Sequence, residues 1–299
     1  MGKATRIRQQ NAREKIAAQR AAAQRAERRR RLFITGGSIL AVVAIVVAFV
    51  VVKSLGSSSA PSKPTSATGT PLPSSAVNDI TNVPASTLQA VGKGSTNPKS
   101  IIRLNGTPLT KDGKPEVLYI GAEYCPYCAA ERWAMAVALS KFGTFTGLRG
   151  IHSSSDDAFP STPTLTFYKT GYTSKYLVFT PVETTTEDRN TPLQKTTAAQ
   201  QALLSKYDAP PYVSQGSTGA IPFIDFGNKF LISGASYSPE VLQGKTWSEV
   251  AAALSDPASP ISQGAVGAAN SMTAAICKLT NNQPATACTP AIQKLEGQL

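Results

Sequence analysis

One stretch decides how this sequence is expected to fold: VLYIGAEYCPYC, residues 117–128. Its first five residues, 117–121, form a short apolar run rich in β-forming residues, as is typical of a buried central strand. Two cysteines follow in a C-x-x-C spacing, and residues 129–141 (AAERWAMAVALSK) then have helical character as far as Gly143. The pattern predicts a strand that runs directly into a helix, with the cysteine pair at the junction.

The position of this junction gives the two cysteines a specific chemistry. Cys125 falls at the start of the helix, where unpaired backbone N–H groups and the helix dipole favour a negative charge. We expect this environment to lower the pKa of the Cys125 thiol and to generate thiolate at neutral pH. Pro126 suits the first helical position, where its missing N–H costs nothing. Cys128 is close enough to attack a mixed disulfide on Cys125, so the pair can cycle between dithiol and disulfide.

Two other interpretations of the C-x-x-C motif are a zinc half-site and a structural disulfide. A zinc site needs four ligands, usually in two close pairs. The other two cysteines, Cys277 and Cys288, lie further apart, and His152 is the single histidine of the sequence. We therefore expect no metal site. An inert disulfide between Cys125 and Cys128 stays open as the alternative to redox activity.

The chain resembles the thioredoxin superfamily in three features that occur in the same order. The first is the strand that leads into Ala122-Glu123-Tyr124-Cys125-Pro126-Tyr127-Cys128, and the second is the helix after it. The third is Ile221-Pro222, which opens a predicted hairpin with its turn at Gly227-Asn228, followed by Gly234 and a helix. The arrangement, over roughly residues 100–245, is similar to a membrane-tethered family of thioredoxin-like domains of unknown function.

This resemblance implies an α/β, thioredoxin-like fold and a thiol–disulfide oxidoreductase in which Cys125 and Cys128 are catalytic. In the superfamily the proline is cis and packs against the cysteine pair, and the residue before it pairs with substrate backbone. The side chains expected to bind unfolded or extended peptide are Ile221, Pro222, Tyr124, Tyr127 and Phe223. We expect no cofactor. The expected partners are protein thiols or disulfides and an unidentified redox protein that recharges the pair.

The sequence departs from the thioredoxin pattern at two points. Thioredoxins keep a buried acid in the strand before the motif as a proton acceptor, and the corresponding position here is Tyr119. Glu123 or Glu131 could substitute for that acid, although we expect both side chains at the surface. The stretch between the C-x-x-C helix and the proline is also long for a minimal thioredoxin. It predicts an insertion at about 156–210, which leaves the substrate open.

The remaining elements follow from turn, cap and periodicity signals. Strands are expected at 100–104 and 108–110, joined by a hairpin turn at Asn105-Gly106, at 145–152, and as a pair around Gly171 within 164–180. Helices are expected at 87–92 with Ser86 as cap, at 192–206 with Thr191 as cap, and at 246–254, 261–279 and 289–297.

Cys277 and Cys288 bring the number of cysteines to four, an even number. In an oxidising compartment, where disulfides persist, a 125–128 pair and a 277–288 pair would use all four. A bridge between Cys277 and Cys288 closes a short loop and would stabilise the fold by just under roughly 3 kcal/mol. We expect this structural role. The alternative is a second redox pair that relays electrons to or from Cys125 and Cys128.

The basic charge of the chain is concentrated at its start. The net charge is +12, but residues 1–31 hold eleven Lys or Arg and two Glu, and the rest of the chain is close to neutral. We therefore expect no nucleic-acid binding. The basic segment is explained instead by the uncharged run at 32–52, LFITGGSILAVVAIVVAFVVV, which is long enough for a helix to span the roughly 30 Å hydrocarbon core of a membrane.

The asymmetry of charge around this run predicts a single-pass protein of the cell membrane. Positive residues before the run place the N-terminus in the cytoplasm and the C-terminal domain outside it. A cleaved signal peptide is the alternative, although its apolar region is normally shorter. The expected organisation is a basic cytoplasmic tail (1–31), a transmembrane helix (32–52), a flexible Ser/Pro/Thr-rich linker (53–83), a thioredoxin-like domain (84–256) and a C-terminal helical extension (257–299).

The expected function is therefore thiol–disulfide exchange on cell-envelope or secreted proteins, with the direction of electron flow open. A rival of another class is a non-catalytic binding module, in which a Cys125–Cys128 bond braces a thioredoxin-fold scaffold. A second rival is a chaperone that holds clients without redox turnover. Thiol reactivity separates the three, because a structural pair should be buried and should have a high pKa.

Overall fold

The structure of the protein is a computed structural model that describes residues 69–97 and 100–299. The basic tail and the apolar run at 32–52 lie outside the described residues, and so does most of the expected linker. Among the helices that the structure describes, none is both long enough and apolar enough to cross a membrane. The transmembrane helix expected at 32–52 therefore stays a prediction.

A mixed sheet lies at the centre of the fold. Its strands are β2 (Ile102–Arg103), β3 (Thr110–Lys111), β4 (Lys114–Gly121), β9 (Val178–Glu183), β10 (Phe223–Phe226) and β11 (Phe230–Ser233). β4 is parallel to β9 on one side and antiparallel to β10 on the other, and β11 and β2 continue the sheet beyond β10. The strand predicted at 117–121 is confirmed as the buried second half of β4.

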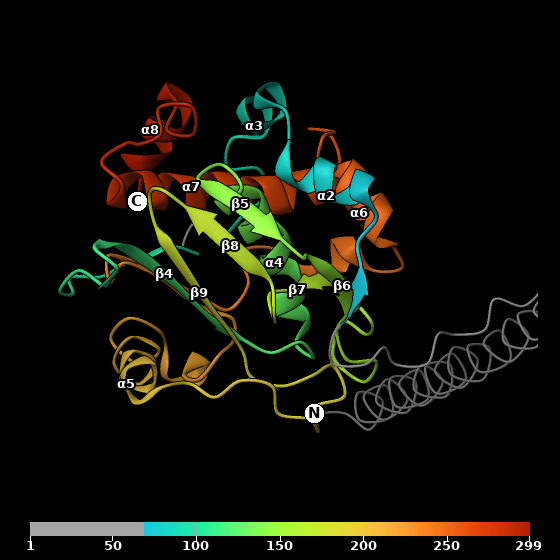
Figure 1. The fold of residues 1–299 in the computed structure, drawn as a ribbon, viewed down its shortest axis with the longest axis horizontal. Helices are drawn as coiled ribbons and strands as arrows, with labels where there is room; N and C mark the ends of the chain where they lie inside the picture. Colours follow the sequence, from blue (N-terminus) through green and yellow to red (C-terminus); the bar gives the residue numbers. More distant parts are fainter. Residues whose placement is uncertain (1–68, 98–99) are drawn as a thin grey trace, which may run out of the picture. The chain divides into compact units, whose positions relative to one another are not determined.

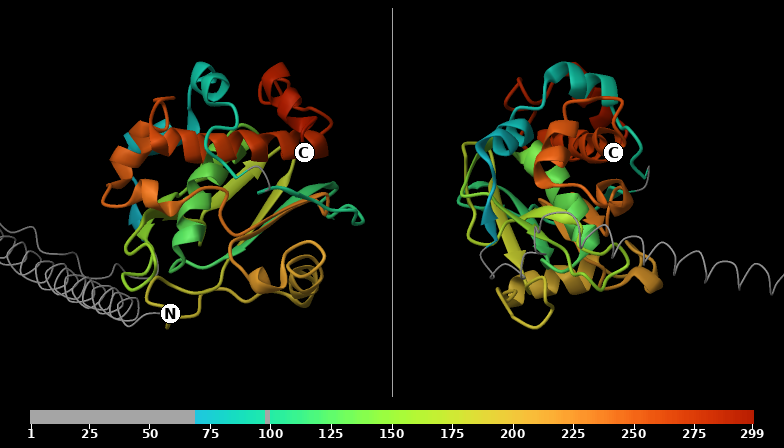
Figure 2. Two further views of the ribbon diagram at one scale, coloured as in Figure 1. Left: turned by 180° about the vertical axis from the view of Figure 1, so that it is seen from behind. Right: turned by 90° about the vertical axis from the view of Figure 1, so that its right-hand side faces the viewer.

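Helices cover both faces of this sheet. The described helices are α2 (Ser74–Thr81), α3 (Ala85–Val91), α4 (Pro126–Leu139), α5 (Ala198–Tyr207), α6 (Trp247–Ala253), α7 (Gly267–Leu279) and α8 (Pro290–Glu296), with short 3₁₀ turns η1 (Gln215–Ser217) and η2 (Pro239–Leu242) and a π-helical turn η3 (Ser262–Val266). Figure 1 shows α4 and α7 on one face of the sheet and α5 on the other. Figure 2 shows the same layers from behind and from the side.

The alternating side chains of β4 divide the core between the two faces, as the two-residue period of a strand requires. Val117 and Tyr119 pack into the larger hydrophobic cluster, which α4 and α7 cover. Leu118 and Ile120 point the other way, into a smaller cluster that α5 covers. The expectation of an α/β fold is confirmed in this coarse form: a mixed sheet between helical layers.

Between α4 and β9 the chain forms two small sheets. Their strands are β5 (Gly143–Thr146), which pairs with β8 (Gly171–Ser174), and β6 (Arg149–His152), which lies between β7 (Pro163–Thr166) and β1 (Thr70–Pro71). The single strand predicted at 145–152 is wrong, because Gly147 adopts a φ of 74° and turns the chain between β5 and β6. The two strands predicted within 164–180 are parts of three: β7, β8 and β9.

The folded part begins earlier than the sequence suggested. The linker expected at 53–83 contains β1 and α2, so its last residues are not a spacer. Ala76 and Ile80 lie one helical turn apart on α2 and, together with Val83, are buried against α4 and α6. With Leu72, which is buried in the same cluster, a few apolar side chains among many small polar ones anchor this segment, because the surface that receives them comes from distant parts of the chain.

The hairpin predicted at Asn105-Gly106 is wrong. β2 pairs with β11 and β3 pairs with β4, so the two segments on either side of this dipeptide do not pair with each other. The hairpin turn lies instead at Asp112-Gly113, where both residues have positive φ, of 52° and 73°. The second predicted hairpin is confirmed, with its turn at Gly227-Asn228 between β10 and β11.

Two predicted helix starts are also wrong. Helix α5 begins at Ala198 rather than at residue 192, because Thr197 and Gln200 form a reciprocal capping box. Thr191, the expected cap, instead accepts a backbone hydrogen bond from Thr186. Ser86 does not cap α3, which starts after Pro84 without a side-chain cap.

The C-terminal helices pack on the rest of the fold as expected from the sequence. The predicted helices at 246–254 and 261–279 correspond to α6 and to η3 followed by α7, and α8 matches the predicted helix at 289–297. Cys277 and Cys288 form a disulfide, so the expected bridge is confirmed and joins the end of α7 to the segment before α8. α7 packs directly against α4, the helix that carries the C-x-x-C motif.

Candidate functional site

The C-x-x-C motif lies where β4 gives way to α4, as predicted. Cys125 is the N-cap residue of α4, and Pro126 occupies its first turn. The Cys125 sulfur accepts a hydrogen bond from the backbone N–H of Cys128, at 3.4 Å. Both cysteines are thiols in this structure, and both are buried, with 5% of Cys125 and none of Cys128 exposed.

The two thiols have opposite acidities. The hydrogen bond from the Cys128 thiol, helped by the backbone N–H groups at the start of α4, lowers the pKa of Cys125 to about 7 against the effect of its burial. Burial raises the pKa of Cys128 well above its usual value, and its hydrogen bond to Cys125 raises it further. Cys125 is therefore the thiol that ionises near neutral pH, and Cys128 stays protonated beside it.

The loop before β10 contacts the cysteine pair. The Ile221–Pro222 peptide bond is cis, as the resemblance implied. The Cys125 thiol lies 3.6 Å from the carbonyl oxygen of Ile221. Pro222 is buried and Ile221 is half-buried, so the structure brings Ile221 to the reactive sulfur, with Pro222 next to it in the chain.

Ile221, whose carbonyl oxygen contacts the Cys125 thiol, also lines an open groove. Tyr127 stands at its edge with 40% of its surface exposed, and its ring meets that of Phe159 edge to face at 5.8 Å between centroids. The other walls come from the Ile221 loop and from the segment after β11, which includes Tyr237. The groove can receive a chain segment that lies along the Ile221 loop with an apolar side chain against the two rings. Phe159 comes from a loop of small and polar residues, and no local pattern pointed to it.

Two of the predicted substrate-binding side chains are placed differently. Phe223 is fully buried in the cluster that α5 covers, because β10 turns this side chain away from the cysteines. It therefore cannot line a docking site. Tyr124 is half-buried under the guanidinium of Arg189, which lies 5.0 Å from the centre of its ring. Arg189 also forms ion pairs with Asp156 and Asp157. These ion pairs hold the guanidinium over the ring of Tyr124.

A buried polar cluster lies beneath the motif. Arg132 donates two hydrogen bonds of 2.7 Å to the carboxylate of Glu183 on β9, and its Nη2 also donates to the carbonyl oxygen of Ala122. Both side chains of this ion pair are fully buried. A bidentate pair with a further carbonyl partner is the geometry in which a buried guanidinium is best tolerated.

Glu123 and Glu131 are fully buried, which corrects the expectation that they lie at the surface. Each has a specific partner: Glu123 accepts the hydroxyl of Thr166, and Glu131 accepts the backbone N–H of Ser236. Burial raises the pKa of both carboxyls to about 7. The fold tolerates them because each carboxyl is hydrogen-bonded and can be neutral.

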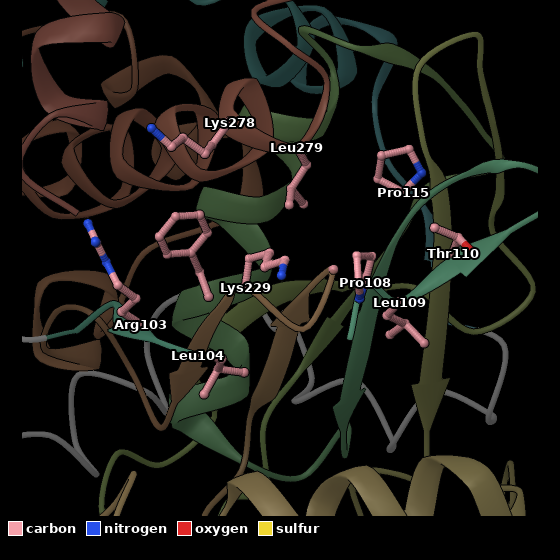
Figure 3. Close-up of a pocket in the computed structure, with 11 residues that line it drawn as sticks. Arg103, Leu104, Pro108, Leu109, Thr110, Pro115, Lys229, Lys278 and Leu279 are labelled. Carbon is pink, nitrogen blue, oxygen red and sulfur yellow. The ribbon is translucent and has the colours of Figure 1, made fainter. Parts of the chain in front are cut away.

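A further pocket among the described residues lies away from the cysteine pair. It adjoins Pro115 at the start of β4, the end of the strand opposite the cysteines. Leu104, Leu109 and Leu279 form its apolar lining, and Arg103, Lys229 and Lys278 surround it (Figure 3). The cations are engaged by the chain itself. Lys229 donates to the carbonyl oxygen of Gly106, Lys278 pairs with Glu296, and Arg103 donates to the carbonyl of Leu299. We assign no function to this pocket.

Metal ligands do not cluster in the part of the chain that the structure describes: no group of three or more His, Cys, Asp or Glu side chains there is arranged to hold a metal ion. The cysteine pair, its buried polar cluster and the adjoining groove together form the candidate site.

Comparison with known proteins places this α/β chain in a family. The family model described as "Domain of unknown function (DUF929)" matches residues 100–278, which is more than half of the chain. The protein therefore belongs to this family, and the matched range contains the cysteine pair and the Ile221-Pro222 loop. No curated protein and no solved structure matches the chain.

Proposed function

We propose that this protein is a membrane-anchored, extracytoplasmic thiol–disulfide oxidoreductase with a thioredoxin-like fold. The observation that carries the proposal is the Cys125 thiol: it caps α4, has a pKa of about 7, and lies 3.6 Å from the carbonyl oxygen of Ile221, a residue that lines an open groove. An inert structural pair has no need of an acidic thiol beside a groove.

The topology supports the thioredoxin-like assignment. The motif follows β4, the parallel neighbour β9 comes later in the chain, and the antiparallel hairpin β10–β11 follows the cis-proline. A closing helix, α7, then packs against α4. This is the order in which the superfamily arranges its motif strand, its cis-proline hairpin and its last helix, with the β5–β8 segment as an addition.

The proposed chemistry is an exchange of disulfide bonds without a cofactor. The Cys125 thiolate attacks one sulfur of a substrate disulfide, which breaks that bond and releases the other sulfur as a thiolate. Cys128 then loses its proton and attacks Cys125, which forms the Cys125–Cys128 bond and releases the second substrate thiolate. The two released thiolates take up one proton each. The reverse sequence oxidises a substrate dithiol.

Two further features support the proposed location. The uncharged run at 32–52 follows a strongly basic segment, which is the pattern of a membrane anchor with its N-terminus in the cytoplasm. The Cys277–Cys288 disulfide is of the kind that persists in oxidising compartments. The substrates proposed are therefore proteins of the cell envelope or secreted proteins.

A redox titration of the full-length chain tests the function. The protein is equilibrated over a glutathione series, alkylated, and analysed by mass spectrometry for the state of each cysteine pair. We expect Cys125 and Cys128 to titrate between about −120 and −270 mV, the range of known exchange proteins, while Cys277 and Cys288 stay oxidised. A double Cys277→Ala, Cys288→Ala variant is the control, because its signal comes from the first pair alone.

The same titration separates the proposal from its rival. A pair that resists reduction below about −300 mV behaves as a structural disulfide. That result would remove the oxidoreductase and favour a tethered binding module in which the Cys125–Cys128 bond braces the scaffold.

A further inference from the structure

Tyr119, near the Cys128 sulfur, has a hydroxyl for which the proposed mechanism gives no role. Tyr119 lies on β4 and is fully buried, and its Oη atom has no hydrogen-bond partner among the described residues. A buried hydroxyl without a partner costs free energy, so its presence calls for an explanation.

The backbone of Gly121 brings this hydroxyl to the Cys128 sulfur. A Cβ atom on Gly121 would lie 2.2 Å from Tyr119 Oη and 3.0 Å from Cys128 Sγ. The hydroxyl oxygen and the sulfur therefore both lie beside the same side-chain-free residue, no more than about 5.2 Å apart.

Arg132 holds the other side of the tyrosine. It follows Cys128 by one helical turn on α4, so both side chains leave the same face of the helix. Its guanidinium lies 5.9 Å from the centre of the Tyr119 ring, and the bidentate pair with Glu183 fixes it there. One guanidinium nitrogen, Nη1, has no hydrogen-bond partner in the described part of the chain. The guanidinium of Arg132 and the unpartnered hydroxyl of Tyr119 thus both lie near the buried Cys128 sulfur.

We propose that Tyr119 donates a hydrogen bond to the Cys128 thiolate as it attacks the mixed disulfide, and that Arg132 is the positioning residue that holds the tyrosine there. The inference rests on the proposed oxidoreductase function. In this step the proton of Cys128 passes to solvent, the Cys125–Cys128 bond forms, and the bond between Cys125 and the substrate sulfur breaks. The substrate leaves as a thiolate and takes up a proton from solvent.

The charged and titratable groups around Tyr119 are consistent with this role. They are Arg132 and Cys128 on α4, Glu183 on β9, and Cys125 at the start of α4. Burial raises the pKa of Tyr119 well above its usual value, so the hydroxyl keeps its proton and stays a donor at neutral pH. Both carboxylate oxygens of Glu183 are bound by Arg132, so this acid is the anchor of the guanidinium and not the partner of the sulfur.

The test is a Tyr119→Phe variant of the full-length, reduced chain, mixed rapidly with an aromatic disulfide, bis(carboxynitrophenyl) disulfide, which releases a coloured thiolate. The first coloured thiolate appears when Cys125 attacks, and the second when Cys128 resolves the mixed disulfide. We expect an unchanged first phase and a second phase that is roughly tenfold slower, since a hydrogen bond to a charged group is lost. The pH midpoint of the second phase should move upward.

Tyr207→Phe is the matched control. Tyr207 is also buried with an unpartnered hydroxyl in the described structure, but it belongs to the cluster on the opposite face of the sheet. This variant should leave both phases unchanged. Cys128→Ser should abolish the second phase and so identify it.

The outcomes separate this inference from the function on which it rests. Unchanged phases in Tyr119→Phe would overturn the role of the tyrosine and leave the oxidoreductase standing. A variant that slows both phases equally, or that melts at a lower temperature, would show a structural effect and would also overturn it. If the unmodified protein releases no coloured thiolate at all, the proposed function itself fails, and the inference fails with it.

Discussion

At the scale of single residues, the chemistry depends on one hydrogen bond between two neighbouring thiols. The Cys125 thiolate is stabilised first by the Cys128 thiol and then by backbone N–H groups. The start of the helix, which the sequence pointed to, therefore stabilises the Cys125 thiolate less than the Cys128 thiol does. The acidity of Cys125 should depend on which atom occupies the position of the Cys128 sulfur.

We therefore predict the pH dependence of alkylation. In the reduced protein, the rate of Cys125 alkylation by iodoacetamide should rise with a midpoint near pH 7, while Cys128 stays unreactive. A Cys128→Ala variant removes the thiol donor, so the midpoint should move upward, toward the ordinary value for a thiol. Alkylation followed by mass spectrometry measures both. A midpoint that does not move would show that the backbone alone stabilises the thiolate.

At the scale of helices and strands, the C-terminal pair of helices depends on a covalent link. α8 has seven residues and buries one of them, Ile292, so little apolar surface holds it against α7. The Cys277–Cys288 disulfide compensates by restricting the unfolded chain.

A double Cys277→Ala, Cys288→Ala variant should lose about 3 kcal/mol of unfolding free energy. Denaturant titration of the variant and the unmodified protein measures the difference. Thiol exchange at Cys125 should be retained, because this disulfide is assigned a structural role. A variant that keeps its stability but loses exchange would favour the alternative, in which Cys277 and Cys288 relay electrons.

Elements with strong local signals were predictable, and those fixed by distant contacts were not. The strand at 117–121, its helix and the Gly227-Asn228 hairpin each carry a local pattern that agrees with the fold. By contrast, α2 depends on the surface that receives Ala76 and Ile80, which no local pattern describes. The hairpin at Asp112-Gly113 carries a turn signal as strong as that of Asn105-Gly106, and pairing with distant strands decided between them.

The candidate site shows the same division. The motif and the Ile221-Pro222 loop were predicted because each has its own sequence signature. The burial of Glu123 and Glu131 was missed because their partners, Thr166 and Ser236, come from other segments. A charged residue can be buried only where such partners exist, and sequence alone does not place them.

At the scale of the whole molecule, these buried carboxyls make stability depend on pH. Burial raises the pKa of Glu123, Glu131 and Asp225 to about 7, well above their values in an unfolded chain. The folded state therefore binds more protons than the unfolded state between roughly pH 4 and 7. The stabilisation that these three carboxyls give the folded state is complete below this window and is lost as the pH rises through 7.

We predict that the protein is more stable near pH 5 than near pH 8 by several kcal/mol, because each of the three carboxyls contributes about 1.4 kcal/mol per pH unit between its unfolded and folded pKa values. The lowered pKa values of His152 and Cys125 act in the opposite direction, but the three raised carboxyl pKa values outweigh them. Glu131→Gln should reduce the difference, whereas Glu240→Gln, at an exposed position, should not. Thermal unfolding followed over this pH range measures both. A protein that is more stable at pH 8 would contradict the burial of these acids in neutral form.

The close approach at Gly121 also limits how this sequence can change. Because a Cβ atom there would overlap the Tyr119 hydroxyl and press on the Cys128 sulfur, the two positions cannot mutate independently. A lineage that acquires alanine at position 121 must first exchange the tyrosine for a smaller residue. The order of such substitutions is then fixed by sterics: position 119 changes first, and position 121 follows.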